Sequence, residues 1–336
     1  MKEVIAKVPD DRRNSLLKLP VAVFLFIVLL LSIVQIKIVN PIILLERFMD
    51  GGGWIEILLI ALYGGFIAFK IQDVYQSHKW RRISWTIFSI FFFSQLLLGL
   101  LGFEKFLMTG ELHLPVPLMI MAGPLYRLEL SIMTLLFLST LIITGPAWCS
   151  QLCYFGAIDN LAARNQKPEP GKIRNLKGIK FMSILLIIAV IIVLRWFKVP
   201  VYYSTLLAAG FGVIGVGIIL IFSSRKGKMV HCLAWCPIGT LVNYGKFINP
   251  FRMYIDSSCT LCMKCRSYCN YDALNPEDIK SGKPSITCTY CGDCLSACHV
   301  NSIKYKFFRL NPVAARRLYL FLTVSFHAVF LALGRI

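Results

Sequence analysis

The sequence predicts a mainly α-helical protein: a polytopic transmembrane helix bundle of six or seven spans, followed by a small α+β cysteine-rich domain. Of the 336 residues, 57% are hydrophobic and 16% are charged, whereas an ordinary soluble domain is about 45–50% apolar and about 25% charged. Long apolar runs come first, and eight cysteines in two equally spaced runs follow them. We expect domain boundaries at 1–249 (helix bundle), 250–310 (cysteine-rich domain) and 311–336 (C-terminal apolar helix).

The apolar runs have the length of membrane spans, because a spanning helix requires about 20 predominantly apolar residues. The candidates are 19–39, 54–70, 83–103, 128–147, 179–197, 203–223 and a weaker seventh at 318–333. The seventh contains His327, so it either spans the membrane or lies along its surface. The first run is longer than the apolar part of a signal peptide and lacks a small-residue cleavage site, so we expect it to be a span.

Lysine and arginine residues lie mostly on one side of these spans. The predicted inner side carries 29 of them and the outer side 7. The loop after the fourth span alone carries six, from Arg164 to Lys180. Because such loops remain in the cytoplasm, we expect a bacterial inner (cytoplasmic) membrane protein whose N-terminus and cysteine runs are cytoplasmic. This distribution accounts for the net charge of +19, so we expect no nucleic-acid binding.

The two cysteine runs have the same spacing, C-x2-C-x2-C-x3-C, and repeat after 29 residues. This is the spacing of bacterial proteins with two [4Fe–4S] clusters, in which the fourth cysteine of each run ligates the other cluster. Zinc prefers two spaced pairs instead. Asn270 and His299 replace the proline that usually ends such a run, so backbone N–H groups become available near the sulfurs. The expected ligands are Cys259, Cys262, Cys265 and Cys298 for one cluster, and Cys288, Cys291, Cys294 and Cys269 for the other.

Four further cysteines form a second internal repeat at the inner ends of the fourth and sixth spans. The spacing C-x3-C occurs at Cys149 and Cys153, and again 83 residues later at Cys232 and Cys236. On a helix each pair would present two thiols on one face. Buried free cysteines are the alternative; an iron–sulfur centre, a copper(I) site and reversible disulfides all suit paired thiolates. The first pair has no basic residue within ten positions, so a neighbouring positive charge cannot neutralise both pairs of thiolates. We therefore expect a metal centre that the two pairs share.

Together these motifs resemble the membrane-bound polyferredoxin family that includes NapH, NosR and CcoG. That family combines several spans, two C-x3-C-P motifs at the cytoplasmic face and a C-terminal two-cluster ferredoxin domain. Cys232 to Pro237 matches the motif, and Cys149 to Cys153 matches it except that Tyr154 replaces the proline. The resemblance covers roughly residues 80–310. It is closest to NapH-like quinol dehydrogenase subunits, because a NosR-like flavin domain is absent at this length.

The resemblance implies electron transfer between membrane quinol and a partner redox subunit, with lipid and the quinone pool as surroundings. The alternatives are a CcoG-like role, in which the edge cysteines hold copper that the clusters reduce, and an assembly or scaffolding protein with structural clusters. No acid, base and nucleophile arrangement typical of a hydrolytic enzyme is visible.

The long outer segment near 103–127 is the predicted quinol site. Pro115 and Pro117 disfavour a regular helix start, so we expect an interfacial or re-entrant segment. In this interpretation His113 accepts a proton from the quinol, since imidazole titrates near neutral pH, and Arg127 orients the ring carbonyl. A surface loop with an apolar underside is the alternative.

Overall fold

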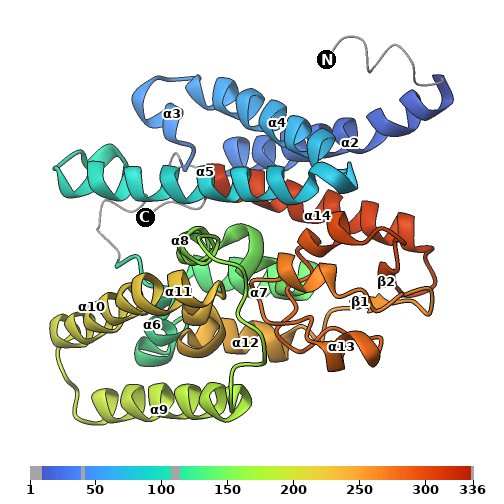
Figure 1. The fold of residues 1–336 in the computed structure, drawn as a ribbon. Helices are drawn as coiled ribbons and strands as arrows, with labels where there is room; N and C mark the ends of the chain where they lie inside the picture. The colour runs from blue at the N-terminus through green and yellow to red at the C-terminus, as the bar shows by residue number, and fades with distance from the viewer. Residues whose placement is uncertain (1–9, 39–41, 107–113, 334–336) are drawn as a thin grey trace.

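The computed structural model describes residues 10–38, 42–106 and 114–333, and these residues are mainly helical (Figure 1). Within them, seven helices are long and apolar enough to cross a membrane. They are Leu16–Lys37, Gly52–Ile71, Val74–Leu100, Met133–Leu152, Leu176–Trp196, Val201–Lys226 and Pro312–Leu333. The predicted fold class is therefore confirmed, and the helix that contains His327 is one of the seven. The chain has the helices of a multi-pass membrane protein.

The helices and strands follow in this order: α2 (Asp10–Lys37), α3 (Leu44–Phe48), α4 (Gly52–Ile71), α5 (Val74–Leu100), α6 (Met119–Arg127), α7 (Ile132–Thr144), α8 (Tyr154–Ala163), α9 (Leu176–Trp196), α10 (Val201–Ile218), α11 (Ser224–Lys226), α12 (Pro237–Gly245), β1 (Phe251–Ile255), α13 (Pro276–Lys280), β2 (Ile303–Phe307) and α14 (Pro312–Leu333).

One layer of the structure consists of α2, α4, α5 and α14 (Figure 1). Its core contains Val23, Ile27, Ala61 and Ala328, all of which are fully buried. A side chain at Gly64 would collide with Ile27, so this glycine allows α2 and α4 to approach closely. The last helix therefore packs against the first two long helices, although about 240 residues separate them in sequence.

The other layer consists of α6 to α12 (Figure 1). The described part of the predicted interfacial or re-entrant segment contains a short helix, α6, which packs against α7 and α9. Before it, Val116 and Leu118 are buried against Ile187 and Ile191 of α9. The helix begins at Met119, two residues after Pro117. His113 lies outside the described residues, so its role stays a prediction.

The cysteine-rich region contains a two-stranded antiparallel sheet, β1 with β2, in which Phe251 pairs with Phe307 and Ile255 with Ile303. Alternate residues of β1 are buried, as expected for a strand with one face on a core. That core includes Tyr319 near the start of α14, which packs on Phe251 with a ring separation of 5.2 Å. The region is thus packed directly against a candidate membrane span.

Candidate iron–sulfur centres

The two edge cysteine pairs have the same backbone conformation. A π-helical turn, Trp148–Leu152 or His231–Trp235, contains the first cysteine of each pair. The second cysteine, Cys153 or Cys236, is extended and begins the next helix, with φ of −82° and −73°. Its N–H donates to the carbonyl five residues earlier at 2.9 Å in both copies. The prediction of one α-helical face is therefore wrong in detail, because a wider turn and a helix start bring the thiols together.

The glycine that follows each pair permits this geometry. A Cβ atom at Gly239 would lie 2.5 Å from the Cys232 carbonyl oxygen, and one at Gly156 would lie 3.2 Å from that of Cys149. At the same helix starts, the second sulfur of each pair accepts backbone N–H groups: Cys153 from residues 155 and 156, and Cys236 from 238 and 239. Such N–H groups stabilise an anionic sulfur.

The four edge cysteines, which we name the edge set, lie together. Each sulfur interacts electrostatically with the others of the set, across the two repeats as well as within them. Among the described residues, no three cysteine sulfurs lie within 4.8 Å of one another. Four sulfurs around one zinc ion would lie about 3.8 Å apart, because each Zn–S bond is about 2.3 Å. The wider spacing favours a cluster over a single ion held by all four thiols.

Two buried features of the edge set suit an anionic metal group. Burial raises the pKa of the Cys153 thiol to about 12, so a positive charge or a metal close to the sulfur would be needed to stabilise its thiolate at neutral pH. Lys180 is 1% exposed, and its Nζ has no hydrogen-bond partner among the described residues. This ammonium interacts electrostatically with Cys149, Cys232 and Cys236. An unpaired buried cation is costly, and thiolates that bind a cluster would balance its charge.

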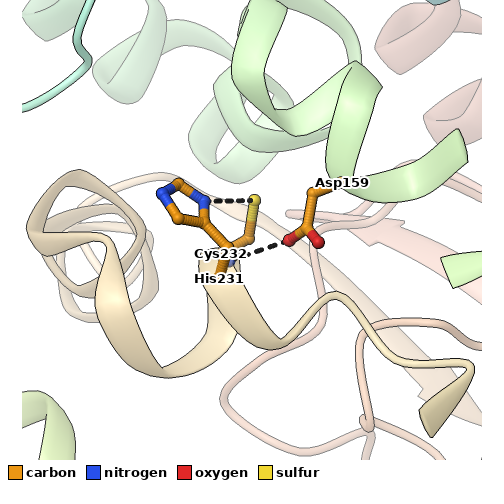
Figure 2. A group of neighbouring side chains, drawn as sticks. All are labelled: Asp159, His231 and Cys232. Carbon is orange, nitrogen blue, oxygen red and sulfur yellow. Dashed lines mark hydrogen bonds between the residues drawn. The ribbon is translucent and has the colours of Figure 1, made fainter. Parts of the chain in front are cut away.

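One cysteine of the edge set, Cys232, also belongs to a mixed donor group with Asp159 and His231 (Figure 2). Asp159 comes from α8, and its Oδ2 accepts the Cys232 N–H at 2.9 Å, while His231 Nδ1 lies 4.0 Å from the Cys232 sulfur. The three ligand atoms lie within 4.8 Å of one another. Burial raises the pKa of Asp159 to about 6 and lowers that of His231 to about 4. Asp159 Oδ1 has no partner among the described residues.

The two ferredoxin-type runs repeat their backbone as well as their sequence. Left-handed residues recur at the 29-residue offset: Leu261 with Tyr290, Met263 with Gly292 and Asp272 with Asn301. A short 3₁₀ turn precedes the fourth cysteine of each run. The sulfurs of those fourth cysteines then accept backbone N–H groups four residues later, from Ala273 at 3.4 Å and Ser302 at 3.3 Å. Consecutive inward N–H groups of this kind form an anion-binding concavity.

Two small cavities separate the eight cysteines into the predicted sets. One is lined by Cys259, Cys262, Cys265 and Cys298, which we name the outer set. The other is lined by Cys269, Cys288, Cys291 and Cys294, which we name the inner set. In each cavity the fourth cysteine comes from the opposite run, as the crossover requires. The structure thus brings together both of the expected ligand sets.

The inner set lies beside the edge set. Tyr271, two residues after Cys269, donates its hydroxyl to the Cys149 carbonyl at 2.9 Å. The fully buried Arg81 contacts both regions: it pairs with Asp293, which lies between Cys291 and Cys294, through two bonds of 2.6 Å. Its third nitrogen donates to the Ser150 carbonyl at 2.6 Å. The sequence has no basic residue close to Cys149 and Cys153, but in the structure Arg81 of α5 lies beside this pair.

Asn270 also makes contacts that the sequence did not predict. Its side chain donates to the Gly227 carbonyl at 2.8 Å, and its own carbonyl accepts the Met229 N–H at 3.0 Å. The residue therefore joins the inner set to the segment just before Cys232. His299 is exposed, and its Nδ1 lies 3.9 Å from the Cys262 sulfur.

The three sets form a row. Three cysteines of the edge set are buried and Cys232 is half-buried, and the inner set contacts the edge set through Tyr271 and Arg81. Cys294 of the inner set interacts electrostatically with Cys265 of the outer set. Cys262 of the outer set is exposed. The row therefore leads from the membrane edge to a surface that another protein can reach.

An apolar cavity of about 300 Å³ lies between α6, α9 and α10. Ala208 and Phe211 of α10 line it, and Trp235 stacks on Phe211 with 4.7 Å between ring centroids. Trp235 directly precedes Cys236 of the edge set. Arg127, one of the two predicted quinol-site residues, lines the same cavity.

Residues 127–180 and 208–249 match a protein family described as a 4Fe-4S binding domain. This chain carries a 4Fe-4S binding domain. The matched segments of the 4Fe-4S binding domain contain all four edge cysteines and none of the other eight. No curated protein and no solved structure matches the chain. The protein is thus a membrane protein with a 4Fe-4S binding domain.

Replacing Cys269 with serine tests the crossover of ligands. We expect the change to alter the EPR signal of the cluster on Cys288, Cys291 and Cys294, because the fourth ligand comes from the other run. The matched change Cys298→Ser should alter the other signal. If Cys269→Ser disturbed the cluster on Cys259, Cys262 and Cys265 instead, the two sets would be wrong.

Proposed function

We propose that this protein passes electrons between membrane quinol and a partner oxidoreductase. The observation that carries the proposal is the row of three four-cysteine sets between an apolar membrane cavity and the exposed Cys262. In this proposal the inner and outer sets hold two [4Fe–4S] clusters and the edge set holds a third. A bound [4Fe–4S] cluster supplies the uptake and release of one electron at a time.

The residues around the apolar cavity suit a quinone head group. Its walls are aliphatic and aromatic, as in most small-molecule sites, and the Arg127 guanidinium is available to donate hydrogen bonds to a ring oxygen. Trp235 both lines this cavity and directly precedes Cys236 of the edge set. Oxidation of one quinol releases two electrons and two protons; the partner oxidoreductase takes the electrons, and water takes the protons. The reverse direction uses the same residues.

Filling the cavity tests this function. Ala208 lines the cavity and Ala209, its neighbour on α10, does not. We expect Ala208→Phe to slow the reduction of the iron–sulfur signals by a quinol in nanodiscs by at least tenfold, because a bulky side chain occupies the ring's position. Iron content and reduction by dithionite should be unchanged. Ala209→Phe is the matched control, and equal quinol rates in the two variants would exclude this cavity as the quinol site.

The charge distribution supports a cytoplasmic position for the partner. The 29 inner lysine and arginine residues include those around the ferredoxin-type runs, so we infer that the exposed outer set faces the cytoplasm. Cys262 and His299 then lie where a cytoplasmic redox protein would bind.

A metal-handling role is the second candidate, and the mixed donor group favours it. The Asp159, His231 and Cys232 ligand atoms are close enough to share one ion, and imidazole with thiolate suits copper or zinc. In this candidate the cargo is a copper(II) ion, which takes one electron from a reduced neighbouring cluster and becomes copper(I); a zinc ion would only be bound, because zinc has no redox chemistry. Copper and zinc analysis of anaerobically purified protein separates the two candidates, because the electron-transfer function requires neither metal.

A further inference from the structure

A cleft of about 940 Å³ opens between the two-stranded sheet and the start of α14. It is separate from the apolar cavity between α6, α9 and α10. Its walls come from the end of α12, from both strands, from the loop after α13 and from the turn that leads into α14. The sheet and the start of α14 lie side by side in Figure 1. None of the cysteines lines this cleft, so the iron–sulfur centres do not account for it.

The cleft is strongly basic. Five lysine or arginine residues line it and no acidic residue does: the five are Lys246, Arg252, Lys283, Lys306 and Arg309. None of the five has an ion-pair partner among the described residues. The five acidic residues of segment 250–310 already pair elsewhere, with Arg81, Arg82, Lys172, Lys228 and Lys304. The positive charge of the cleft is therefore uncompensated within the described chain.

The five cations divide into two kinds. Lys246 is buried and donates to the carbonyls of Ile286 at 2.6 Å and Cys288 at 3.1 Å. Arg252 likewise binds backbone carbonyls. The hydrogen bonds of these two residues therefore fix the backbone that forms the inner wall of the cleft. Lys283, Lys306 and Arg309 are exposed, so their charged groups are available to a ligand.

The rim of the cleft lies at the membrane boundary. Pro312, which lines the cleft, begins a candidate span. Asn249, close to the start of β1, donates its side-chain amide to the carbonyl of Ile142 at 2.6 Å, and Ile142 lies within another candidate span. Three exposed apolar residues line the cleft, Phe247, Phe308 and Leu310, of which Phe308 is 70% exposed. Two more, Ile248 and Val313, directly follow lining residues in sequence.

We propose that this cleft binds an anionic phospholipid. The headgroup phosphate would contact the exposed cations of the cleft, and the acyl chains would lie along the apolar rim beside α14. Basic pockets at the cytoplasmic ends of membrane helices bind anionic headgroups by this combination of charge and apolar contact. The cleft also shares Met253 and Pro284 with the cavity of the inner cysteine set, so the lipid would cover one wall of that set.

Native mass spectrometry of the full-length protein, taken from nanodiscs that contain equal amounts of phosphatidylglycerol and phosphatidylcholine, tests this proposal. We expect at least tenfold preferential retention of phosphatidylglycerol. The triple change Lys283→Gln, Lys306→Gln and Arg309→Gln should reduce this preference at least tenfold. It should leave the iron content unchanged, which shows that the variant is folded.

The control variant removes the same charges elsewhere on the inner side. Lys167, Arg174 and Lys177 are exposed and lie outside the cleft, so their change to glutamine should leave the preference intact. An equal loss in both triple variants would overturn the proposal, because it would show general attraction to an anionic surface. Equal thermal stabilisation by phosphatidylglycerol and by soluble glycerophosphate would also overturn it, since the acyl chains would then contribute nothing.

Discussion

Replacing Arg81 with glutamine is expected to lower the free energy of unfolding by about 3–5 kcal/mol, because it leaves the buried Asp293 carboxylate without its main partner. Arg81 and Asp293 are 2% and 4% exposed, and two bonds of 2.6 Å join them. The change also removes the donor to the Ser150 carbonyl. Thermal unfolding in detergent, followed by tryptophan fluorescence, measures the effect.

Arg82 provides the matched control for this experiment. It binds the same carboxylate through a single bond of 3.0 Å and is more exposed, at 14%. Because Arg81 keeps both of its bonds to the Asp293 carboxylate in this variant, Arg82→Gln should have a much smaller effect. The double variant Arg81→Gln with Asp293→Asn should be no less stable than Arg81→Gln alone. Additive losses would contradict the assignment of the pair as one unit.

Serine at Cys153 is expected to remove about four iron atoms per chain, because the edge set would lose one ligand of its cluster. The same loss is expected for serine at Cys149, Cys232 or Cys236, since the proposed function places one cluster on all four cysteines. Iron and sulfide analysis of anaerobically purified protein, together with EPR of the reduced state, measures it. The signals of the clusters on the inner and outer sets should persist.

The quadruple edge variant sharpens this test. It should lose no more iron than any single variant, whereas four cysteines acting separately would give different and additive defects. Cys262→Ser is the control, because it removes an exposed ligand of the outer set and should alter a different EPR signal. Unchanged iron content in every edge variant would leave the edge thiols as buried packing residues.

The sequence predicted the spans and the cysteine sets because both depend on local patterns. The span predicted at 54–70 corresponds to α4 (Gly52–Ile71), because the length of an apolar run is enough to predict a membrane span. The crossover of Cys269 and Cys298 between the two cavities followed from the spacing of the runs.

The contacts between the centres could not be predicted in this way. Arg81 and Asp293 are 212 residues apart, and no local pattern pairs a cation on a span with an aspartate in a loop. Lys180 was counted among the loop charges, yet it is buried beside the edge cysteines. The π-helical turns were also missed, because i and i+4 spacing does not distinguish a wider turn from an α-helix.

The repeated edge motif has a consequence for the ancestry of this protein. Each copy consists of a span, a π-helical turn, an extended cysteine and a following helix, and each supplies two of the four thiols. A protein with a single copy could complete the set only by pairing with a second molecule. Duplication and fusion of such a gene would have made a two-subunit site permanent within one chain. The two halves would then have been free to diverge, as Tyr154 and Pro237 at equivalent positions indicate.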